Sequence, residues 1–318
     1  MTGATGSVGS NVCRLAAGRG IAVKALVRPG SDAGPLRQCG VEPVVGDVTD
    51  RDSLAAAARG VDGVIHCAAQ LGGTWSTARP EDYEAVNQWG TINVLDAAGA
   101  ARTVVLLSAV VGDRRLTATE TSPIATISPT NSPYLRTKLA AFYEGMARAA
   151  RGADINFVVP GGVYGPTPIL ERALAPTIFT GTLLMAARGE LRRYLPMPIS
   201  WVLAEEVADV ALRALEHGRP ARRYLAMGRP EDTCSLPQFC NTFLELAGID
   251  HRVEEFDPSG PGVATDPEFG SMATLMQDSY PSPSHDPART TTELGRRPTS
   301  LRDGLSATLM WLRDNRVV

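Results

Sequence analysis

The feature that most constrains this chain is a regular alternation of short apolar runs with longer, Ala-rich segments between residues 21 and 166. The apolar runs are rich in Val and Ile and favour buried strands, whereas the segments between them favour helices. We predict strands at Ile21–Val27, Val41–Asp47, Gly63–Ala69 and Thr103–Ser108, and a further strand in Ile155–Pro166 that is stopped by the proline and glycines of this segment. Helices are predicted at Asn11–Ala17, Asp52–Ala58, Tyr83–Ala98 and Tyr134–Arg151. Such alternation is typical of an α/β protein with a parallel, doubly wound sheet, in which ligands bind beyond the carboxyl ends of the strands.

The second half of the chain is less regular. Helices are predicted at Ala173–Arg188 and Glu205–His217, and leucines at helical spacing predict a docked C-terminal helix over Leu301–Asp314. Because a single core stops growing near ~250–300 residues, a chain of 318 residues has room for a second lobe. We expect a sheet domain over residues 1–166 to which 201–228 return, a smaller substrate-binding lobe from 167–200 and 229–300, and a terminal helix in 301–318.

Composition narrows the range of partners. The formal net charge is −3, from 31 basic and 34 acidic residues spread along the chain, which disfavours binding to nucleic acid or to an anionic membrane. The five cysteines are odd in number and lack CxxC spacing, so neither a disulfide framework nor a metal site is expected. No apolar run approaches the roughly 18–20 residues that span a bilayer. We therefore expect a cytoplasmic protein that acts on a small molecule.

Three glycines follow the N-terminus, where Gly3, Gly6 and Gly9 form a GxxGxxG motif just before the first predicted helix. Without side chains, the backbone N–H groups of such a turn and the helix N-terminus can approach a pyrophosphate. The spacing differs from GxGxxG, and a tight turn without a ligand is the alternative interpretation.

The strand that should precede this turn is missing, because TGATGSVG begins at residue 2. In a parallel sheet that strand is central and buried. One hypothesis is that Met1 is a misassigned start inside a longer reading frame, where a GTG valine codon that ends the strand was read as an initiator. Intact-mass analysis of the natural product would reject this hypothesis if it showed Met1 as the true terminus.

The residue that ends the second strand indicates which dinucleotide is bound, because an acid accepts hydrogen bonds from a ribose 2′-hydroxyl and an arginine accommodates a 2′-phosphate. Here that residue is Arg28, and no acid stands near it before Asp32. A guanidinium binds phosphate in a bidentate fork, so the sequence favours NADP over NAD. An ordinary surface arginine is the alternative.

Tyr134 and Lys138 lie four residues apart at the start of a predicted helix, so their side chains project from one face. A phenol titrates near ~10 in water, and a nearby ammonium stabilises its phenolate, which acid-base work at neutral pH requires. Ser108 ends the preceding strand, where its hydroxyl could hold a substrate carbonyl oxygen. The register leaves open whether Ser108 or Ala109 takes that position, and Ala109 would leave activity weak or absent.

Together these motifs resemble those of the extended short-chain dehydrogenase/reductase superfamily over nearly the whole chain. TGATGSVG is similar to its cofactor loop, GDVTD to its adenine-contacting pair, VIHCAA to its fourth-strand motif, YLRTK to its catalytic signature, and PGGVYGP to its nicotinamide-facing loop. ALVRPGSD and GVEPVVGDVTDRDSL resemble the dihydroflavonol reductase and 3β-hydroxysteroid dehydrogenase-like group.

The resemblance implies a Rossmann-type fold and hydride transfer between nicotinamide and a carbonyl or carbinol carbon. Tyr134 would exchange the oxygen's proton, Lys138 would bind the nicotinamide ribose, and Asn87 would be a structural asparagine. The cofactor residues implied are Gly3, Thr5, Gly6, Ser7, Val8, Gly9, Arg28, Asp47, Val48, Ala68, Ala69, Tyr134, Lys138, Pro160 and Val163. Family members often dimerise through two helices, which here would be Tyr83–Ala98 and the helix bearing Tyr134.

Three functions follow from these observations. The first is an NADP-dependent oxidoreductase with a Tyr/Lys/Ser mechanism. The second is a nucleotide-sugar epimerase or dehydratase with retained NAD, in which Arg188, Arg192 and Arg193 would bind a diphosphate unless they are a solvated helix end. The third is an NADP-binding regulatory protein with little or no turnover.

Overall fold

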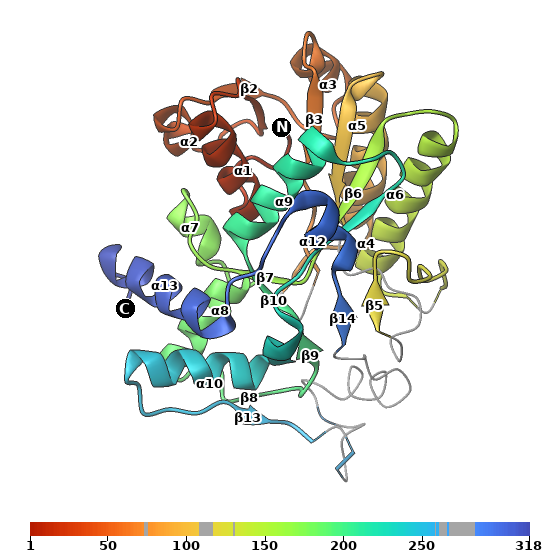
Figure 1. The fold of residues 1–318 in the computed structure, drawn as a ribbon. Helices are drawn as coiled ribbons and strands as arrows, with labels where there is room; N and C mark the ends of the chain where they lie inside the picture. Colours follow the sequence, from red (N-terminus) through yellow and green to blue (C-terminus); the bar gives the residue numbers. More distant parts are fainter. Residues whose placement is uncertain (73–75, 108–116, 130, 258, 261–265, 267–283) are drawn as a thin grey trace.

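The computed structural model describes residues 1–318 except 73–75, 108–116, 130, 258, 261–265 and 267–283 (Figure 1). Its main sheet is parallel and contains four strands. Their spatial order is β11 (Arg223–Ala226), β6 (Ile155–Pro160), β4 (Arg102–Leu106) and β3 (Gly63–His66). Beyond β3, a parallel pair consists of β1 (Lys24–Val27) and β2 (Glu42–Val45). The predicted α/β fold with a Rossmann-type parallel sheet is confirmed.

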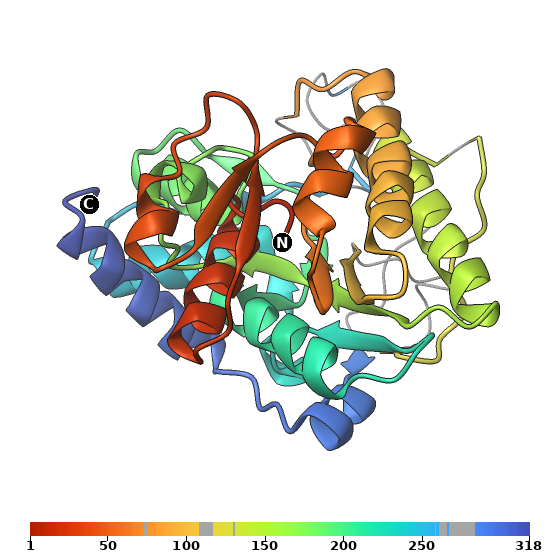
Figure 2. The same cartoon turned by 90° about the horizontal axis from the view of Figure 1, so that it is seen from above.

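Helices cover both faces of this sheet because its strands are apolar on both sides (Figure 2). Along β4, Val104 and Leu106 point into one core cluster and Val105 into the opposite one. The first cluster contains residues of α1 (Ser7–Gly18) and α9 (Ala204–His217). The other face is covered by α3 (Arg51–Ala58), α5 (Gly90–Ala98) and α6 (Pro133–Ala150). The N-termini of several helices thus lie at the edge where the strands end.

Among the described residues, only Met1 and Thr2 lie between β3 and β1. Thr2 forms an isolated parallel bridge with His66, and the Leu26 N–H donates to the Met1 carbonyl at 2.8 Å. These two residues stand where the sequence analysis expects a first strand.

The strand predicted in Ile155–Pro166, which the proline and glycines of this segment stop, is confirmed as β6, and the chain changes partners at Gly161. β6 ends at Pro160, and β7 (Gly162–Tyr164) then pairs in parallel with β10 (Trp201–Leu203). A Cβ at Gly161 would lie 2.1 Å from the Ser200 carbonyl oxygen. At the Pro-Gly-Gly sequence the backbone therefore passes so close to Ser200 that only glycine fits at position 161.

The single helix predicted at Ala173–Arg188 is wrong. The structure has two helices, α7 (Leu170–Ala173) and α8 (Phe179–Ala187). Pro176 lies between them, where it lacks the N–H that a continuous helix needs and disfavours helical geometry at the residue before it. At Gly181 a Cβ would lie 2.2 Å from the Ala175 carbonyl oxygen, so this connection packs closely on α8.

The helix predicted at Tyr83–Ala98 begins earlier and contains a π-helical segment. It comprises α4 (Pro80–Tyr83), the π-helix η1 (Glu84–Trp89) and α5. The predicted helix at Glu205–His217 is confirmed as α9, and the Tyr134–Arg151 helix as α6.

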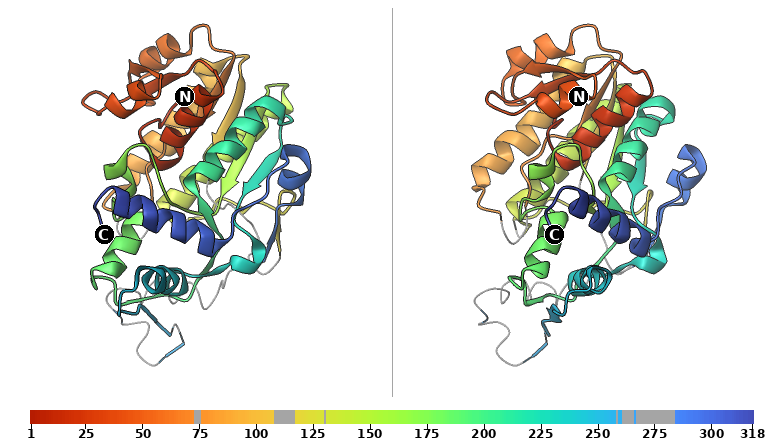
Figure 3. Two further views of the ribbon diagram at one scale, coloured as in Figure 1. Left: turned by 60° about the vertical axis from the view of Figure 1, so that its left-hand side comes forward. Right: turned by 90° about the vertical axis from the view of Figure 1, so that its left-hand side faces the viewer.

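A second core lies beneath the sheet, built from apolar residues of the C-terminal half such as Trp201 and Phe239, whose rings stack 3.9 Å apart. The predicted C-terminal helix is confirmed as α13 (Leu301–Asp314), which packs on α10 (Leu236–Ala247) at the side of this core (Figure 3). The remaining elements are α2 (Gly34–Gln38), β5 (Ala118–Thr119), β8 (Arg193–Tyr194), β9 (Pro198–Ile199), η2 (Pro230–Asp232), β12 (Cys234–Ser235), β13 (Glu254–Glu255), β14 (His285–Asp286) and α12 (Ala288–Leu294). Across the described residues, every helix is too short or too polar to cross a bilayer.

Candidate active site

The glycine loop connects Thr2 to α1 and packs against the end of β3. Gly3 has a φ of +68°, and a Cβ there would lie 2.5 Å from the Ala68 backbone nitrogen. A Cβ at Gly9 would lie 2.1 Å from the Gly3 carbonyl oxygen. Around Gly6 the nearest atom to an added Cβ is the Gly3 oxygen at 3.3 Å, so this glycine is the least enclosed of the three. Gly3 and Gly9 close the turn, and Gly6 leaves its outer side accessible.

The N-terminus of α1 suits an anion. Gly6 is its N-cap and supplies no side-chain bond to the first-turn N–H groups, which therefore remain available. Ser7 Oγ is buried and has no hydrogen-bond partner within the described residues. Thr5 and Val8 are half-buried in the same turn. Free N–H groups, the helix dipole and an unpartnered hydroxyl together fit the pyrophosphate of a dinucleotide.

Arg28 directly follows β1, at the same edge of the sheet as the glycine loop. Its side chain is exposed and forms no ion pair with any residue that the structure describes. The nearby acid, Asp32, instead accepts the Gly34 N–H through Oδ1 at 2.8 Å. The guanidinium is thus available to a ligand, whereas Asp32 stabilises its own loop.

Asp47 and Val48 follow β2 at this edge as well. Asp47 Oδ1 accepts the Thr49 N–H and hydroxyl, both at 2.8 Å, and the side chain stays half-exposed. Val48 is buried against Gly90, and its carbonyl accepts a bond from Asn93 Nδ2 at 3.0 Å. The contact of Asp47 and Val48 with an adenine stays a prediction. The hydrogen bonds of the Asp47 side chain and the Val48 carbonyl hold this part of the backbone in place.

The loop over residues 67–72 joins the glycine loop to the helix that bears Tyr134. Near its start, Ala68 touches Gly3, and Ala69 next to it is half-buried. At Gln70, in the middle of the loop, the backbone forms two hydrogen bonds of 2.8 and 3.0 Å with the Asn87 side chain. Near its end, a Cβ at Gly72 would lie 2.8 Å from Tyr134 Cγ. Asn87 is therefore a structural asparagine, as the resemblance implies.

Tyr134 and Lys138 lie in the first turns of α6, and their side chains project from one face of it. The Tyr134 ring meets the Tyr83 ring edge to face, with centroids 6.1 Å apart. Lys138 is only 5% exposed, and its Nζ donates to the Leu106 carbonyl at 3.2 Å. Burial lowers the pKa of Lys138 to about 8. The ammonium thus lies at the carboxyl end of β4, beside the tyrosine.

Ser108 and Ala109, the two candidates for the hydroxyl position, lie outside the described residues. Pro160 ends β6 and Val163 lies in β7, both half-buried. These two residues belong to the same edge of the sheet as the glycine loop.

His66 is a core residue that is 1% exposed. Its Nδ1 lies 2.7 Å from Thr2 Oγ1 and its Nε2 lies 2.9 Å from Thr91 Oγ1. The Thr91 hydroxyl donates to the Asn87 carbonyl, so Nε2 must be the donor to Thr91 and Nδ1 the acceptor from Thr2. Burial lowers the pKa of His66 to about 3, and the ring is neutral.

Sequence reasoning missed Asn11. This residue is 2% exposed, and its Nδ2 donates to the Ser7 and Pro166 carbonyls, both at 3.0 Å. Asn11 thereby ties the start of α1 to the end of the PGGVYGP segment. The available signal was a polar residue within the first predicted helix, because such a residue needs hydrogen-bond partners where it is buried.

Arg193 does not point to a diphosphate site. Its guanidinium pairs with Asp266 at 2.9 Å and lies 5.0 Å from the centroid of the Phe256 ring. Arg193 is therefore already engaged with Asp266 and Phe256, which disfavours a diphosphate-binding role for Arg193 itself.

A parallel α/β sheet, a glycine loop at a helix N-terminus and a Tyr-Lys pair at the same edge define a dinucleotide-binding enzyme. The chain belongs to the NAD dependent epimerase/dehydratase family, whose model matches residues 1–226. The resemblance to extended short-chain dehydrogenases/reductases is confirmed, and the protein is an NAD(P)-dependent enzyme of the oxidoreductase and epimerase type.

Proteins that are named for several different activities match nearly the whole chain. Sterol demethylase protein B of Methylococcus capsulatus is 28% identical over 346 residues, which cover 100% of this chain and 99% of that protein. A putative dihydroflavonol 4-reductase of Synechocystis is 27% identical and covers 99% and 94%. The structure of a UDP-glucose 4-epimerase from Thermotoga maritima superposes with a TM-score of 0.79 at 18% identity, covering 99% and 98%, and shows the shared fold.

Proposed function

We propose that this protein is an NADP-dependent oxidoreductase that transfers a hydride between nicotinamide and a carbonyl or alcohol substrate. The observation that carries the proposal is the buried Lys138 ammonium at the end of β4, next to Tyr134 on the same helix face. The 67–72 loop connects this pair to the glycine loop, so cofactor and acid-base groups share one edge of the sheet. The match to a putative dihydroflavonol 4-reductase supports the same reaction class.

The chain's own residues supply positioning and proton transfer. The glycine loop and Ser7 would hold the pyrophosphate, and when bound the dinucleotide would supply or accept the hydride. Tyr134 donates a proton to the substrate oxygen during reduction and takes it back during oxidation. Lys138, held by the Leu106 carbonyl, stabilises the phenolate that this exchange leaves on Tyr134.

The preference for NADP rests on Arg28 and Asp32. Arg28 is exposed at the end of β1 with no acidic partner within the described chain, and Asp32 binds the Gly34 N–H instead. A 2′-phosphate would find a free guanidinium there, whereas a 2′-hydroxyl would find no carboxylate nearby.

The test is a fluorescence titration with NADPH and NADH on wild type, Arg28→Ala and Arg37→Ala. We expect NADPH to bind at least tenfold more tightly than NADH, and Arg28→Ala to weaken NADPH about tenfold or more while NADH is unchanged. Arg37→Ala, on neighbouring α2, is the matched control and should leave both affinities unchanged. Equal affinity for the two nucleotides in wild type would contradict the cofactor assignment.

Tyr134→Phe tests the chemistry in a screen of ketone and aldehyde substrates. The variant should bind NADPH like wild type and lose about 10²–10⁴-fold in kcat, the size of a general acid-base contribution. NAD that remains bound through purification, with no net turnover, would instead favour a nucleotide-sugar epimerase or dehydratase. NADPH binding without turnover on the whole panel would favour a regulatory role.

A further inference from the structure

Two residues that the proposed reaction does not use lie against the Tyr134 side chain. The Tyr83 ring meets the Tyr134 ring edge to face, with centroids 6.1 Å apart and an angle of 71° between the planes. The other residue is Gly72, where an added Cβ would lie 2.8 Å from Tyr134 Cγ and 2.9 Å from Tyr134 Cβ. Tyr83 is only 7% exposed. The Tyr134 side chain therefore rests against a buried ring and a backbone segment at once.

The contact with Tyr134 explains why position 72 is a glycine. The φ of Gly72 lies outside the left-handed region, so other residues can adopt its backbone conformation. The three atoms that an added Cβ would approach most closely all belong to Tyr134. The absence of a side chain at position 72 is thus what leaves room for the Tyr134 ring.

The Tyr83 hydroxyl connects its own ring to the segment that carries Gly72. Its oxygen lies 3.2 Å from the Leu71 carbonyl oxygen and 2.7 Å from Ser76 Oγ, and Ser76 Oγ donates to the same carbonyl at 2.9 Å. The Leu71 carbonyl therefore has two hydroxyl groups around it, directly before Gly72. Tyr83 contacts the loop through its hydroxyl and Tyr134 through its ring.

The helix that bears Tyr83 is fixed against both the loop and α6. Four residues after Tyr83, the Asn87 side chain binds the Gln70 backbone and also donates to Thr137 Oγ1 on α6 at 3.4 Å. Both α4 and η1 pack on α6. The contact between Tyr83 and Tyr134 is therefore one part of an extended contact between two helices.

We propose that Tyr83 is a positioning residue for Tyr134 and that Gly72 completes the same support. The inference rests on the proposed function, in which Tyr134 exchanges the proton of the substrate oxygen. A tyrosine side chain rotates about two bonds, and proton transfer needs its oxygen within hydrogen-bond distance of the substrate oxygen. Contacts with Tyr83 and Gly72 restrict these rotations, so the phenol is oriented before the substrate binds.

The kinetic test compares Tyr83→Leu, Tyr83→Phe and Gly72→Ala with wild type on a substrate found in the carbonyl screen. Tyr83→Leu removes the supporting ring and Gly72→Ala displaces the Tyr134 ring, so we expect each to lower kcat about tenfold or more. KM and NADPH affinity should stay within about twofold, because alignment matters only in the transition state. Tyr83→Phe keeps the ring contact and should stay within about threefold of the wild-type kcat.

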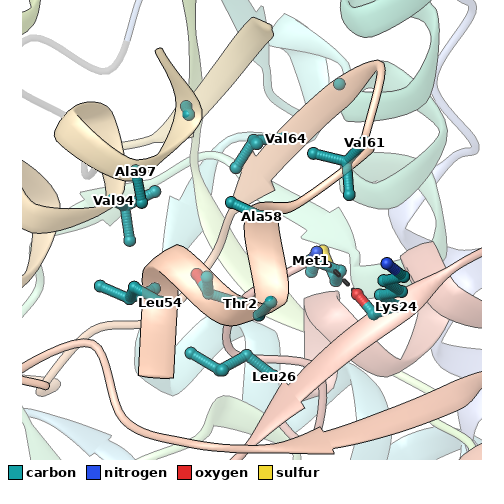
Figure 4. Close-up of a pocket in the computed structure, with 13 residues that line it drawn as sticks. Met1, Thr2, Lys24, Leu26, Leu54, Ala58, Val61, Val64, Val94 and Ala97 are labelled. Carbon is teal, nitrogen blue, oxygen red and sulfur yellow. Dashed lines mark hydrogen bonds between the residues drawn. The ribbon is translucent and has the colours of Figure 1, made fainter. Parts of the chain in front are cut away.

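Val94→Ala is the matched control for a loss of stability on the same helix. Val94 lies on α5, is 2% exposed, and lines an apolar pocket with Leu26, Leu54 and Val64 (Figure 4). The variant should lower the melting temperature, as Tyr83→Leu does, and leave kcat within about twofold. An equal loss of kcat in Val94→Ala and Tyr83→Leu would reduce the role of Tyr83 to stability and overturn the proposal.

A spectroscopic measurement reads the same support without turnover, which separates a failure of this inference from a failure of the proposed function. In protein labelled with 3-fluorotyrosine, the fluorine resonance of Tyr134 is identified by its loss in Tyr134→Phe. We expect Tyr83→Leu and Gly72→Ala each to shift this resonance and Val94→Ala to leave it in place. If the protein turns over no substrate, the proposed function fails, and this resonance alone decides whether Tyr83 and Gly72 hold Tyr134.

An unchanged Tyr134 resonance in both Tyr83→Leu and Gly72→Ala would overturn the proposal. So would values of kcat in these two variants that lie within about twofold of wild type. If Tyr83→Leu does not fold, Tyr83→Met takes its place, because the flexible methionine side chain adapts to the space that the ring leaves.

Discussion

His66 and Lys138 are ionisable side chains buried between the glycine loop and α6, and each is held by short polar contacts. His66 uses both ring nitrogens on threonine hydroxyls, and Lys138 donates to the Leu106 carbonyl. The YxxxK spacing predicts the Tyr-Lys pair. The burial of Lys138 could not be predicted, because it depends on where the end of β4 meets α6.

His66 makes the fold sensitive to acid. Its pKa is about 3 in the folded protein against 6.5 in an unfolded chain, so between these values the unfolded state binds more protons. We expect the free energy of unfolding to fall as pH drops from 6.5 toward 3, by up to about 1.4 kcal/mol per pH unit from this group. Urea unfolding at pH 6.5, 5.5 and 4.5 measures the slope. His66→Gln is the control and should show a shallower slope, and parallel slopes would contradict the assignment.

At the scale of elements, the candidate site lies at the carboxyl edge of the sheet, where hydrogen bonds and close contacts connect several loops. Local patterns predict α6, α9 and α13 well, because each is a long run with a clear apolar face. The break at Pro176 follows from the proline's missing N–H, whereas the change of partners at Gly161 is decided by a close backbone contact with the distant Ser200. Asn11 escaped notice for the same reason, since the Pro166 carbonyl that it binds is 155 positions away.

Asn11→Ala should loosen the link between α1 and the segment that ends at Pro166. Without the amide, the half-buried Pro166 carbonyl loses its donor, which costs about 0.5–1.5 kcal/mol of stability. We also expect NADPH to bind several-fold more weakly, as measured by the same fluorescence titration. Asn156→Ala is the matched control, because buried Asn156 donates to the Ala214 carbonyl at 3.0 Å, away from the glycine loop. It should lower stability without changing NADPH affinity, and an equal loss of affinity in both variants would refute a specific role for Asn11.

At the scale of the whole molecule, one exposed aromatic residue suggests how two copies associate. Trp89 is 54% exposed on η1, which packs beside α6, and Tyr143 on α6 is 39% exposed. Exposed aromatic side chains on adjacent helices are typical of a protein interface. We therefore propose a homodimer through η1, α5 and α6, the helices that the family resemblance implies.

Trp89→Glu should convert that dimer to monomer, because a carboxylate at the centre of an apolar interface has no partner. Light scattering after size-exclusion chromatography measures the mass, which is 33.7 kDa for one chain. Met310→Glu is the control, since Met310 is 65% exposed on α13 and should leave the dimer intact. A wild-type protein that elutes as a monomer at micromolar concentration would rule out this interface.

The packing of α1 against α9 has a consequence for biosynthesis. α1 covers residues 7–18 and α9 covers residues 204–217, and their apolar faces share one core. At about 5–20 residues per second, a ribosome needs roughly 10–40 s to make the chain between them. During that interval the part of the α1 surface that packs on α9 lacks its native partner. The helix that supports the glycine loop therefore reaches its final packing only after α9 has been synthesised.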